Sequence, residues 1–451
     1  MTPFIDRWGR APGQAWLGAL TCAALLGAST GCSSDSSDQP ERPAFVVGML
    51  VEQDDLMYTQ QELGAVVMAM RQINDDGGLT IDGVDYQLSV KAEDHESNPA
   101  GAVAAMKRLS DSGVTATIGP PWSSLALGDE PDHADGVSLN AREYDMLLVS
   151  SSATAPAITE LDDDDLQWRT IPSDIVEADI AAQELLSRDL KRVALLYRDE
   201  AWGQGLAAAF TAAFEAGGGQ VLASVGYDAS GATVEDLNAY DFDAELASVF
   251  ADQPQVVLLY SFDELAQITN RVAAGDYLSR YGDTPPRFFG TEGSVTSGLL
   301  VNGAPEVIQY MEGVSPTPDE ADPHYREFKG WMTVAELNIA DNTAAARYDA
   351  VFCLAAAVQK ANSRKADDIK LELQAISRKD GDELTVHAGE WAKAKAALLK
   401  GDDIDYDGVS GRIEFSDQGD PTTGLYSIWQ LVQAKGGKFV IEPTKTVPYG
   451  D

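Results

Sequence analysis

The sequence predicts an α/β protein in which mostly parallel sheets, covered by helices on both faces, are divided between two lobes. Short apolar runs alternate with amphipathic helical stretches along most of the 451 residues, which is the pattern of repeated strand–helix–strand units. This alternation comes in two blocks that change over near Asp162–Thr170. Hydrophobic residues form 44% of the chain, so each block can bury a core of its own.

The first block consists of four apolar runs with helical stretches between them. Gly77 and Gly78 end its first helix, because glycine readily adopts the backbone conformation that terminates helices. The expected strands are Ala44–Val51, Tyr86–Ala92, Val114–Ile118 and Met146–Val149, and the expected helices are Gln60–Asn74, Pro99–Ser110 and one that starts at Ser123.

The second block repeats this alternation after Thr170. Its expected strands are Arg192–Tyr197, Gln220–Tyr227, Gln255–Tyr260 and Arg287–Gly290, and its expected helices are Ile175–Arg188, Trp202–Ala216, Asp243–Phe250 and Asp263–Ala274. A later alanine-rich helical stretch, Pro323–Ala361, is expected to return to the first lobe. Because ligands of parallel sheets bind outside the carboxyl ends of the strands, the residues that follow each strand are the candidates for a site.

The composition restricts the classes of function. Asp and Glu number 72 against 32 Lys and Arg, a formal net charge of −40. An acidic surface of this kind repels phosphate backbones and anionic lipid, so we expect no nucleic-acid partner. With four histidines and three cysteines, the chain shows no Ser-His-Asp arrangement and no metal-ligand spacing, and we expect no enzyme, no cofactor and no metal. His95 is expected in a solvated loop, His324 and His387 as isolated residues, and Cys353 as a buried small hydrophobe.

The N-terminus has the pattern of an export signal. Two arginines precede an apolar run, Ala15–Ala28, that is too short to span a membrane, and small residues then lead to Cys32. This pattern resembles a bacterial lipoprotein signal, which implies removal of residues 1–31, lipidation of Cys32 and a flexible tether over residues 32–43. Ser29 stands where that family usually has leucine, so ordinary cleavage to a free periplasmic protein is the alternative. Either way we expect a protein on the periplasmic side of the cell envelope that meets the membrane only through a lipid anchor.

Several short motifs follow one another in a fixed order along about residues 44–440. They are Phe45–Met49, Gly64-Ala65, Ile73–Gly78, Thr117–Gly119 followed by Ser123-Ser124, Ser150–Pro156, Trp202–Gly205, Gly290–Gly293 and Tyr406–Asp420. In this order they resemble the bacterial periplasmic binding proteins for leucine, isoleucine and valine, which deliver solute to an ABC transporter. Each motif is weak by itself, and their order makes the resemblance specific.

The resemblance implies the type I periplasmic binding fold, in which two α/β lobes are joined by three crossovers and close on a solute. Lobe I would comprise residues 44–168 and 319–419, and lobe II residues 169–318 and 420–446. The crossovers are expected near Gln167–Pro172, Ser315–Asp322 and Asp417–Thr423, with a final strand of lobe II at about Leu425–Val432.

The ligand implied by this resemblance is an amino acid, whose two charged ends need different partners. Its carboxylate needs hydroxyls and free backbone N–H groups, and its ammonium needs an acceptor-only carboxylate. Ser123 and Thr154 follow two neighbouring strands and by resemblance hold the carboxylate, together with the Ser152-Ala153 backbone. By the same resemblance, Glu292 of the opposite lobe holds the ammonium.

The remaining candidate ligand-binding residues are mostly aromatic. Trp202 replaces the tyrosine usual at its position and would stack over the ligand, and Ser261-Phe262 replaces an aromatic pair common in the family. Tyr58, in the first strand–helix loop, is a weaker candidate for the side-chain end of the ligand. Three alternatives stay open: Ser123 as a helix N-cap only, Glu292 as a solvated surface acid, and Trp202 as a surface aromatic.

Two other motif matches are interpreted as coincidental. Gly203–Ala208 fits a dinucleotide fingerprint but begins too far beyond its strand for a phosphate-binding turn. Asp403–Glu414 has the spacing of a calcium loop, yet no exiting helix is expected after it, so calcium is the lesser alternative there. The acidic stretch Gly128–Gly136 has no assigned role.

We therefore expect a non-enzymatic, exported solute-binding protein that captures an amino acid or a similar small polar solute for an ABC permease. The alternative is a binding lipoprotein that presents its ligand to a signalling receptor, because the same fold serves both roles. The sequence leaves the identity of the solute open.

Overall fold

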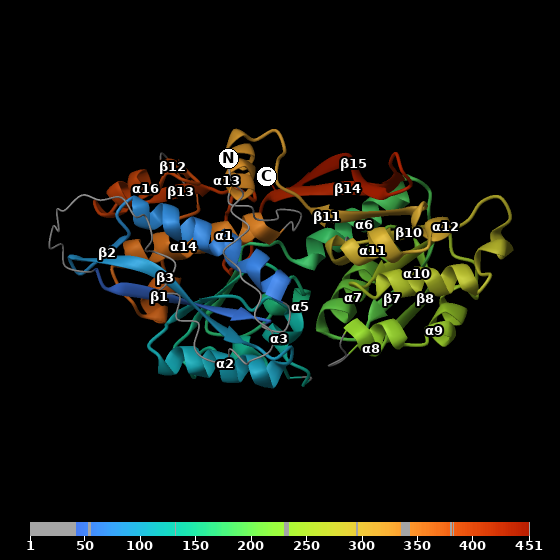
Figure 1. Cartoon of the computed structure of the whole chain (residues 1–451), viewed down its shortest axis with the longest axis horizontal. Coiled ribbons are helices and arrows are strands. Elements are labelled where there is room, and N and C mark those ends of the chain that lie inside the picture. Colours follow the sequence, from blue (N-terminus) through green and yellow to red (C-terminus); the bar gives the residue numbers. More distant parts are fainter. Residues whose placement is uncertain are drawn as a thin grey trace, which may run out of the picture. The chain divides into compact units, whose positions relative to one another are not determined.

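The computed structural model describes residues 42–52, 56–130, 132–229, 234–294, 296–334, 343–378, 381 and 383–450. In these residues the strands form two large, mainly parallel sheets with helices packed on them (Figure 1). The predicted α/β class is therefore confirmed. Residues 1–41, which include the predicted signal and Cys32, lie outside the described residues.

The first sheet has the strand order β2-β3-β1-β4-β5-β6, and its neighbouring strands are parallel except for β2 and β3. Helices α1 and α14 lie on one face of this sheet and α2 on the other (Figure 1). The strands are β1 (Ala44–Val51), β2 (Leu79–Ile81), β3 (Val84–Asp94), β4 (Ala116–Ile118), β5 (Leu147–Ser150) and β6 (Gln167–Arg169). The helices are α1 (Leu56–Asp75), α2 (Pro99–Asp111), α3 (Ser123–Leu127), α4 (Val137–Asn140), α5 (Pro156–Thr159) and α14 (Thr343–Ala361).

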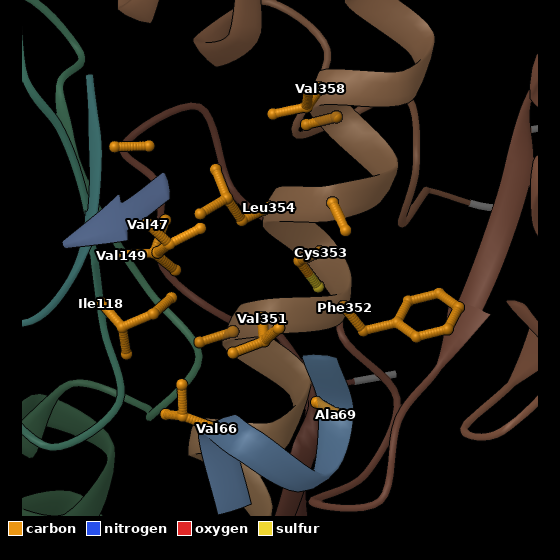
Figure 2. Packing of buried hydrophobic residues seen from close by; sticks show 14 of the residues in the cluster. Val47, Val66, Ala69, Ile118, Val149, Val351, Phe352, Cys353, Leu354 and Val358 are labelled. Carbon is orange, nitrogen blue, oxygen red and sulfur yellow. The ribbon is translucent and has the colours of Figure 1, made fainter. Parts of the chain in front are cut away.

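Helix α14 lies at the centre of the core on this sheet. Val47, Ile118 and Val149 come from three neighbouring strands and lie beside Val351 and Leu354 of the helix (Figure 2). Each of these side chains is buried, which stabilises the fold by about 1.5–3 kcal/mol per residue relative to exposure. The helix is buried nearly all round, which agrees with its lack of a polar face. The predicted return of this stretch to the first sheet is therefore observed.

The second sheet has the strand order β15-β14-β11-β10-β9-β7-β8, with β14 and β15 antiparallel to their neighbours. Alternate residues of β7 face opposite sides, so that Val193 and Leu195 pack with α6 and α7, while Ala194 and Leu196 pack with α9 and α10. The strands are β7 (Arg192–Arg198), β8 (Gln220–Tyr227), β9 (Val256–Tyr260), β10 (Arg287–Gly290), β11 (Met311–Pro316), β14 (Gly424–Gln433) and β15 (Phe439–Tyr449). The helices are α6 (Asp174–Ser187), α7 (Ala201–Ala216), α8 (Val234–Ala239), α9 (Asp243–Val249), α10 (Leu265–Ala274), η2 (Leu278–Tyr281), η3 (Glu292–Ser294), α11 (Ser297–Asn302) and α12 (Pro305–Ile308).

Strands β12 and β13 form a small parallel sheet, and β13 lies in the stretch with calcium-loop spacing. Asp403 pairs with Lys360, and the carboxylate of Asp349 accepts the backbone N–H groups of Val409 (3.0 Å) and Ser410 (2.8 Å). The stretch is therefore an extended strand and a turn held by protein groups. The elements here are α13 (Pro323–Val334), α15 (Ala366–Lys370), β12 (Leu384–His387), α16 (Trp391–Leu398) and β13 (Ile404–Asp407). No helix among the described residues combines the length and the apolar character needed to cross a bilayer.

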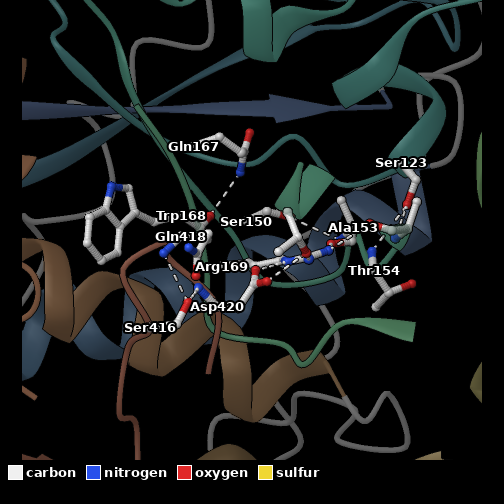
Figure 3. A network of polar contacts seen from close by, with 12 residues as sticks. Ser123, Ser150, Ala153, Thr154, Gln167, Trp168, Arg169, Ser416, Gln418 and Asp420 are labelled. Carbon is white, nitrogen blue, oxygen red and sulfur yellow. Dashed lines mark hydrogen bonds and ion pairs between the residues drawn. The ribbon is translucent and has the colours of Figure 1, made fainter. Parts of the chain in front are cut away.

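The chain passes between the two large sheets after β6, after β11 and before β14. These three segments meet around a small hollow lined by Thr170–Pro172, Pro316–Pro318, Ala346, Ser410–Ile413, Pro421, Thr423–Leu425 and Tyr449. A buried ion pair joins the first segment to the third, because Nε of Arg169 lies 2.5 Å from Oδ1 of Asp420 (Figure 3). Asp420 also accepts the hydroxyl of Thr159 at 2.7 Å.

The structure corrects two expectations about histidines. His95 is buried, with its ring against the edge of Trp122 (centroids 4.8 Å apart), and burial lowers its pKa to about 4. His324 and His387 are not isolated, because their rings stack 3.8 Å apart at an angle of 8°. Cys353 is a buried free thiol, as expected.

Removing the acid of the buried ion pair should destabilise the protein strongly. Asp420→Ala leaves the Arg169 guanidinium buried without its counter-charge, and we expect the free energy of unfolding in urea to fall by about 3–5 kcal/mol. Asp417→Ala is the matched control, because Asp417 is exposed and lies 3.6 Å from Arg378; it should cost less than about 1 kcal/mol. Equal losses in the two variants would contradict the stated role of the pair.

Candidate functional site

Ser123 is the first residue of α3 and follows β4, as predicted. Its Oγ accepts the backbone N–H groups of Thr154 (3.1 Å) and Ala155 (3.0 Å), in the loop after β5 (Figure 3). The N-cap position of α3 belongs to Trp122, so the Ser123 hydroxyl does not cap its own helix. Instead, Ser123 joins the ends of two neighbouring strands.

Further hydroxyls hold the same two loops together. Ser150 Oγ donates to the carbonyl of Pro120 (2.7 Å) and accepts the N–H of Ala153 (3.0 Å). Ser152 Oγ donates to the carbonyl of Pro121 at 2.9 Å. The loop N–H groups expected to bind a carboxylate thus already have serine acceptors, and the hydroxyls of Ser150 and Ser152 already donate to carbonyls. The Ser123 hydroxyl, which accepts two N–H groups, is therefore the donor of this loop pair best suited to an anionic group.

The loop after β5 contacts the first turn of α6 directly. The backbone N–H of Asp174 donates to the Thr154 carbonyl (2.9 Å), and the Thr154 hydroxyl bonds to the Asp174 carboxylate. Helix α7 approaches the same loop, because Gly205 lies against Pro156 so closely that a Cβ there would be 2.9 Å from the proline ring. Residues of the first-sheet loops and of the second-sheet helices therefore adjoin at Thr154.

Three carboxylates gather beside this contact. Asp174 and Glu177 lie in the first turn of α6, Glu292 lies in η3 after β10, and one oxygen of each falls within 4.8 Å of the others. Burial raises the pKa of all three groups, and the charge of Glu292 raises those of Asp174 and Glu177 further. The carboxyls of Glu177 and Glu292 also interact with each other, which raises the pKa of Glu177 further and acts against the rise in the pKa of Glu292. The structure thus places Glu292 in a shielded acidic cluster, next to Thr154.

The aromatic candidates form a stack beside Glu292. Trp202, at the start of α7, is buried and stacks on Phe262 with ring centroids 4.6 Å apart and an angle of 20°. The guanidinium of Arg198 lies 4.8 Å from the centre of the Phe262 ring. Gly293, the neighbour of Glu292, passes so close that a Cβ would lie 2.6 Å from Phe262 Cε1. The position of Glu292 therefore depends on this stack.

Two predicted residues lie elsewhere. Ser261 is buried, and its Oγ accepts the hydroxyl of Tyr227 at 2.9 Å. The Tyr227 hydroxyl also lies 2.6 Å from the Glu264 carboxylate. Tyr58 falls in the first turns of α1 and not in a loop, and its side chain is outside the described residues.

The sequence reasoning missed three members of this region: Asp174, Glu177 and Tyr260. Asp174 and Glu177 are spaced i, i+3, so they share a helix face directly after the crossover. Acids in a first helical turn are common because they interact favourably with the helix dipole. The sequence alone therefore gives no sign that these two belong to a site. Tyr260 is the last residue of the apolar strand β9, so its sequence context predicts a core residue.

Two α/β units joined by three chain crossings, with polar loops at the carboxyl ends of their strands, define a type I periplasmic binding protein. Residues 61–434 match the family described as the receptor family ligand binding region, and the chain belongs to this family.

Curated relatives and solved structures that resemble this chain include solute-binding proteins. The chain is similar to the Leu/Ile/Val-binding protein BraC3 of Rhizobium johnstonii, with 31% identity over 36% of this chain and 41% of BraC3, less than half of that protein's length. It is also similar to BasB of Halobacterium salinarum, a substrate-binding protein of a chemotactic signal transduction system, with 26% identity over 82% of each chain. The structure of LivJ from Streptococcus pneumoniae, a branched-chain amino acid transporter substrate-binding protein in complex with isoleucine, superposes with a TM-score of 0.64 at 19% identity and covers 89% of this chain and 99% of LivJ. The fold expected from the resemblance is thus confirmed.

A methyl group at residue 293 should disturb the Glu292 loop. Gly293→Ala forces the added carbon against Phe262, so we expect the Trp202–Phe262 stack to shift and tryptophan fluorescence to change. Gly330→Ala, in α13 with open space around the added carbon, is the control and should leave the spectrum unchanged. An unaltered spectrum in Gly293→Ala would show that the loop is not held by the stack.

The acidic cluster should make the stability of the ligand-free protein depend on pH. The folded-state pKa of Glu177 lies above its ordinary value of 4.5, so the folded protein keeps a proton that the unfolded chain releases, and stability falls as pH rises through this window. Glu177→Gln removes this loss, so its free energy of unfolding relative to wild type should improve between about pH 5 and pH 8. Urea unfolding at both pH values measures this, with the exposed Glu143→Gln as control. A difference that does not change with pH would contradict the assignment.

Proposed function

We propose that this protein is a solute-binding protein of the cell envelope that captures an amino acid or a similar small polar solute between its two lobes and delivers it to an ABC permease. The supporting observation is the contact between Thr154 and Asp174, which puts a hydroxyl-bearing loop directly beside a cluster of buried carboxylates. A zwitterion needs donors at one end and acceptor-only groups at the other, and both are present within one small region.

In this proposal the two ends of the solute contact different elements. The carboxylate binds at Ser123 and Thr154, whose loop backbone is already fixed by Ser123 Oγ. The ammonium binds at Glu292, whose shielded carboxylate gains more from a positive partner than an exposed one would. Capture then favours closure of the lobes, predicted as residues 44–168 with 319–419 and 169–318 with 420–446, because closure excludes water from the charge pair.

The relatives support an amino-acid ligand. BraC3 is named for leucine, isoleucine and valine, and LivJ holds isoleucine. Ser261-Phe262 stands where the family commonly has an aromatic pair, so the groups that would contact the ligand's side chain differ. The preferred amino acid therefore need not be branched. We further propose export through a lipoprotein signal, with Cys32 lipidated, and no catalytic activity.

A second role is favoured by the match to BasB. That relative belongs to a chemotactic system and aligns over 82% of both chains. The same capture step can present a closed, loaded protein to a signalling receptor instead of a permease. Co-purification of the loaded protein with either a permease or a receptor from the native membrane distinguishes the two roles.

The test of the proposed ligand is a thermal-shift screen of the 20 amino acids, followed by calorimetry on the best one. Glu292→Gln should weaken that amino acid by about 1.5–3 kcal/mol, the scale of one charge-assisted hydrogen bond. The exposed Glu306→Gln is the matched control and should bind like wild type. If no amino acid raises the melting temperature, or if Glu292→Gln binds as tightly as wild type, the proposed ammonium site is wrong.

A further inference from the structure

When its three carboxyls are ionised, the acidic cluster carries more negative charge than one ammonium can neutralise. Asp174 Oδ2, Glu177 Oε1 and Glu292 Oε2 are buried and have no hydrogen-bond partner among the described residues. The positive charge that acts on Asp174 is Arg169, but its guanidinium is bound to Asp420 and Thr159. A single ammonium would leave two of three carboxylates without a counter-charge.

A separate group faces the same point. Tyr260, on β9, is 1% exposed, and its hydroxyl has no partner among the described residues. Burial raises the pKa of this hydroxyl, and the charges of Glu177, Asp174 and Glu292 raise it further. A buried phenol without a partner, beside three carboxylates with free oxygens, indicates that these groups are arranged around something that the protein itself does not supply.

We propose that Asp174, Glu177 and Glu292 bind one hard divalent cation, with Ca²⁺ as the fitting ion. All donors are oxygens, which Ca²⁺ prefers, and the cluster offers neither the sulfur nor the imidazole that zinc prefers. Ca²⁺–oxygen distances of about 2.3–2.6 Å allow oxygens around one ion to lie up to about 5 Å apart. The mutual separation of at most 4.8 Å in the cluster meets this limit.

The cation site goes beyond the proposed function and interacts with it through Glu292. The ion and the ammonium of an amino acid compete for this carboxylate, so each should weaken the binding of the other. With the ion in place, the formal charge of the three ionised carboxylates falls from −3 to −1. The ion-loaded cluster therefore attracts a solute ammonium less strongly than the empty cluster does.

The experiment uses the mature chain, freed of metal with a chelator, and Tb³⁺ as a luminescent probe for a Ca²⁺ site. Tyr260 and Trp202, whose rings lie 6.5 Å apart, are positioned to transfer excitation energy to an ion in the cluster. We expect one saturable site with sensitised luminescence that Ca²⁺ displaces. Glu177→Gln should weaken the ion by about tenfold or more, because one of three charged ligands is lost.

The matched control is Glu143→Gln, which removes the same charge from the surface. It should leave Tb³⁺ luminescence unchanged, whereas equal behaviour of Glu177→Gln and Glu143→Gln would mean that the ion binds only the acidic surface and would overturn the site. Circular dichroism and the melting temperature show whether Glu177→Gln is folded, and Ca²⁺ should raise the melting temperature of wild type but not of this variant.

A thermal-shift screen of the 20 amino acids in the presence of chelator separates the two proposals. A protein that binds one of them but shows no Ca²⁺-dependent melting shift overturns the cation site and leaves the proposed function in place. A protein that binds Ca²⁺ at the cluster, as judged by Glu177→Gln, but binds no amino acid supports the cation site and overturns the proposed amino-acid ligand.

Discussion

The loop Ala153–Ala155 is held from both sides, and the candidate site depends on this double restraint. On one side Ser123 Oγ accepts the N–H groups of Thr154 and Ala155. On the other side Arg169 donates to the carbonyl oxygens of Ala153 (3.3 Å) and Ala155 (3.1 Å). Arg169 also binds Asp420, which lies in the segment before β14. The loop beside the acidic cluster and two of the three segments that pass between the sheets are therefore hydrogen-bonded to one another (Figure 3).

Two kinds of buried charge lie close together and differ in their energetics. The guanidinium of Arg169 has a carboxylate, a hydroxyl and two carbonyls as acceptors, so its desolvation is offset within the protein. The carboxylates of Asp174, Glu177 and Glu292 each keep one buried oxygen without a hydrogen-bond partner among the described residues. The paired Arg169 guanidinium stabilises the fold. The three carboxylates instead cost folding free energy, and they are available to a positively charged ligand.

The candidate site could be predicted only in part. Ser123 and Thr154 were recognisable because each follows a strand in a family motif, and Glu292 because it is an acid between glycines after another strand. Their actual contacts were not predictable, since Ser123 binds backbone amides and not its own helix. Asp174 could not be told from other acids in a first helical turn, because its proximity to Glu292 arises only when the fold brings the segment after β10 beside the start of α6.

The sequence by itself determined the alternation of strands and helices, the two blocks and the burial of Cys353, because periodicity and apolar runs are properties of neighbouring residues. It could not determine that His95 would be buried or that His324 would stack on His387. These outcomes join residues far apart along the chain. Only the tertiary structure brings them together.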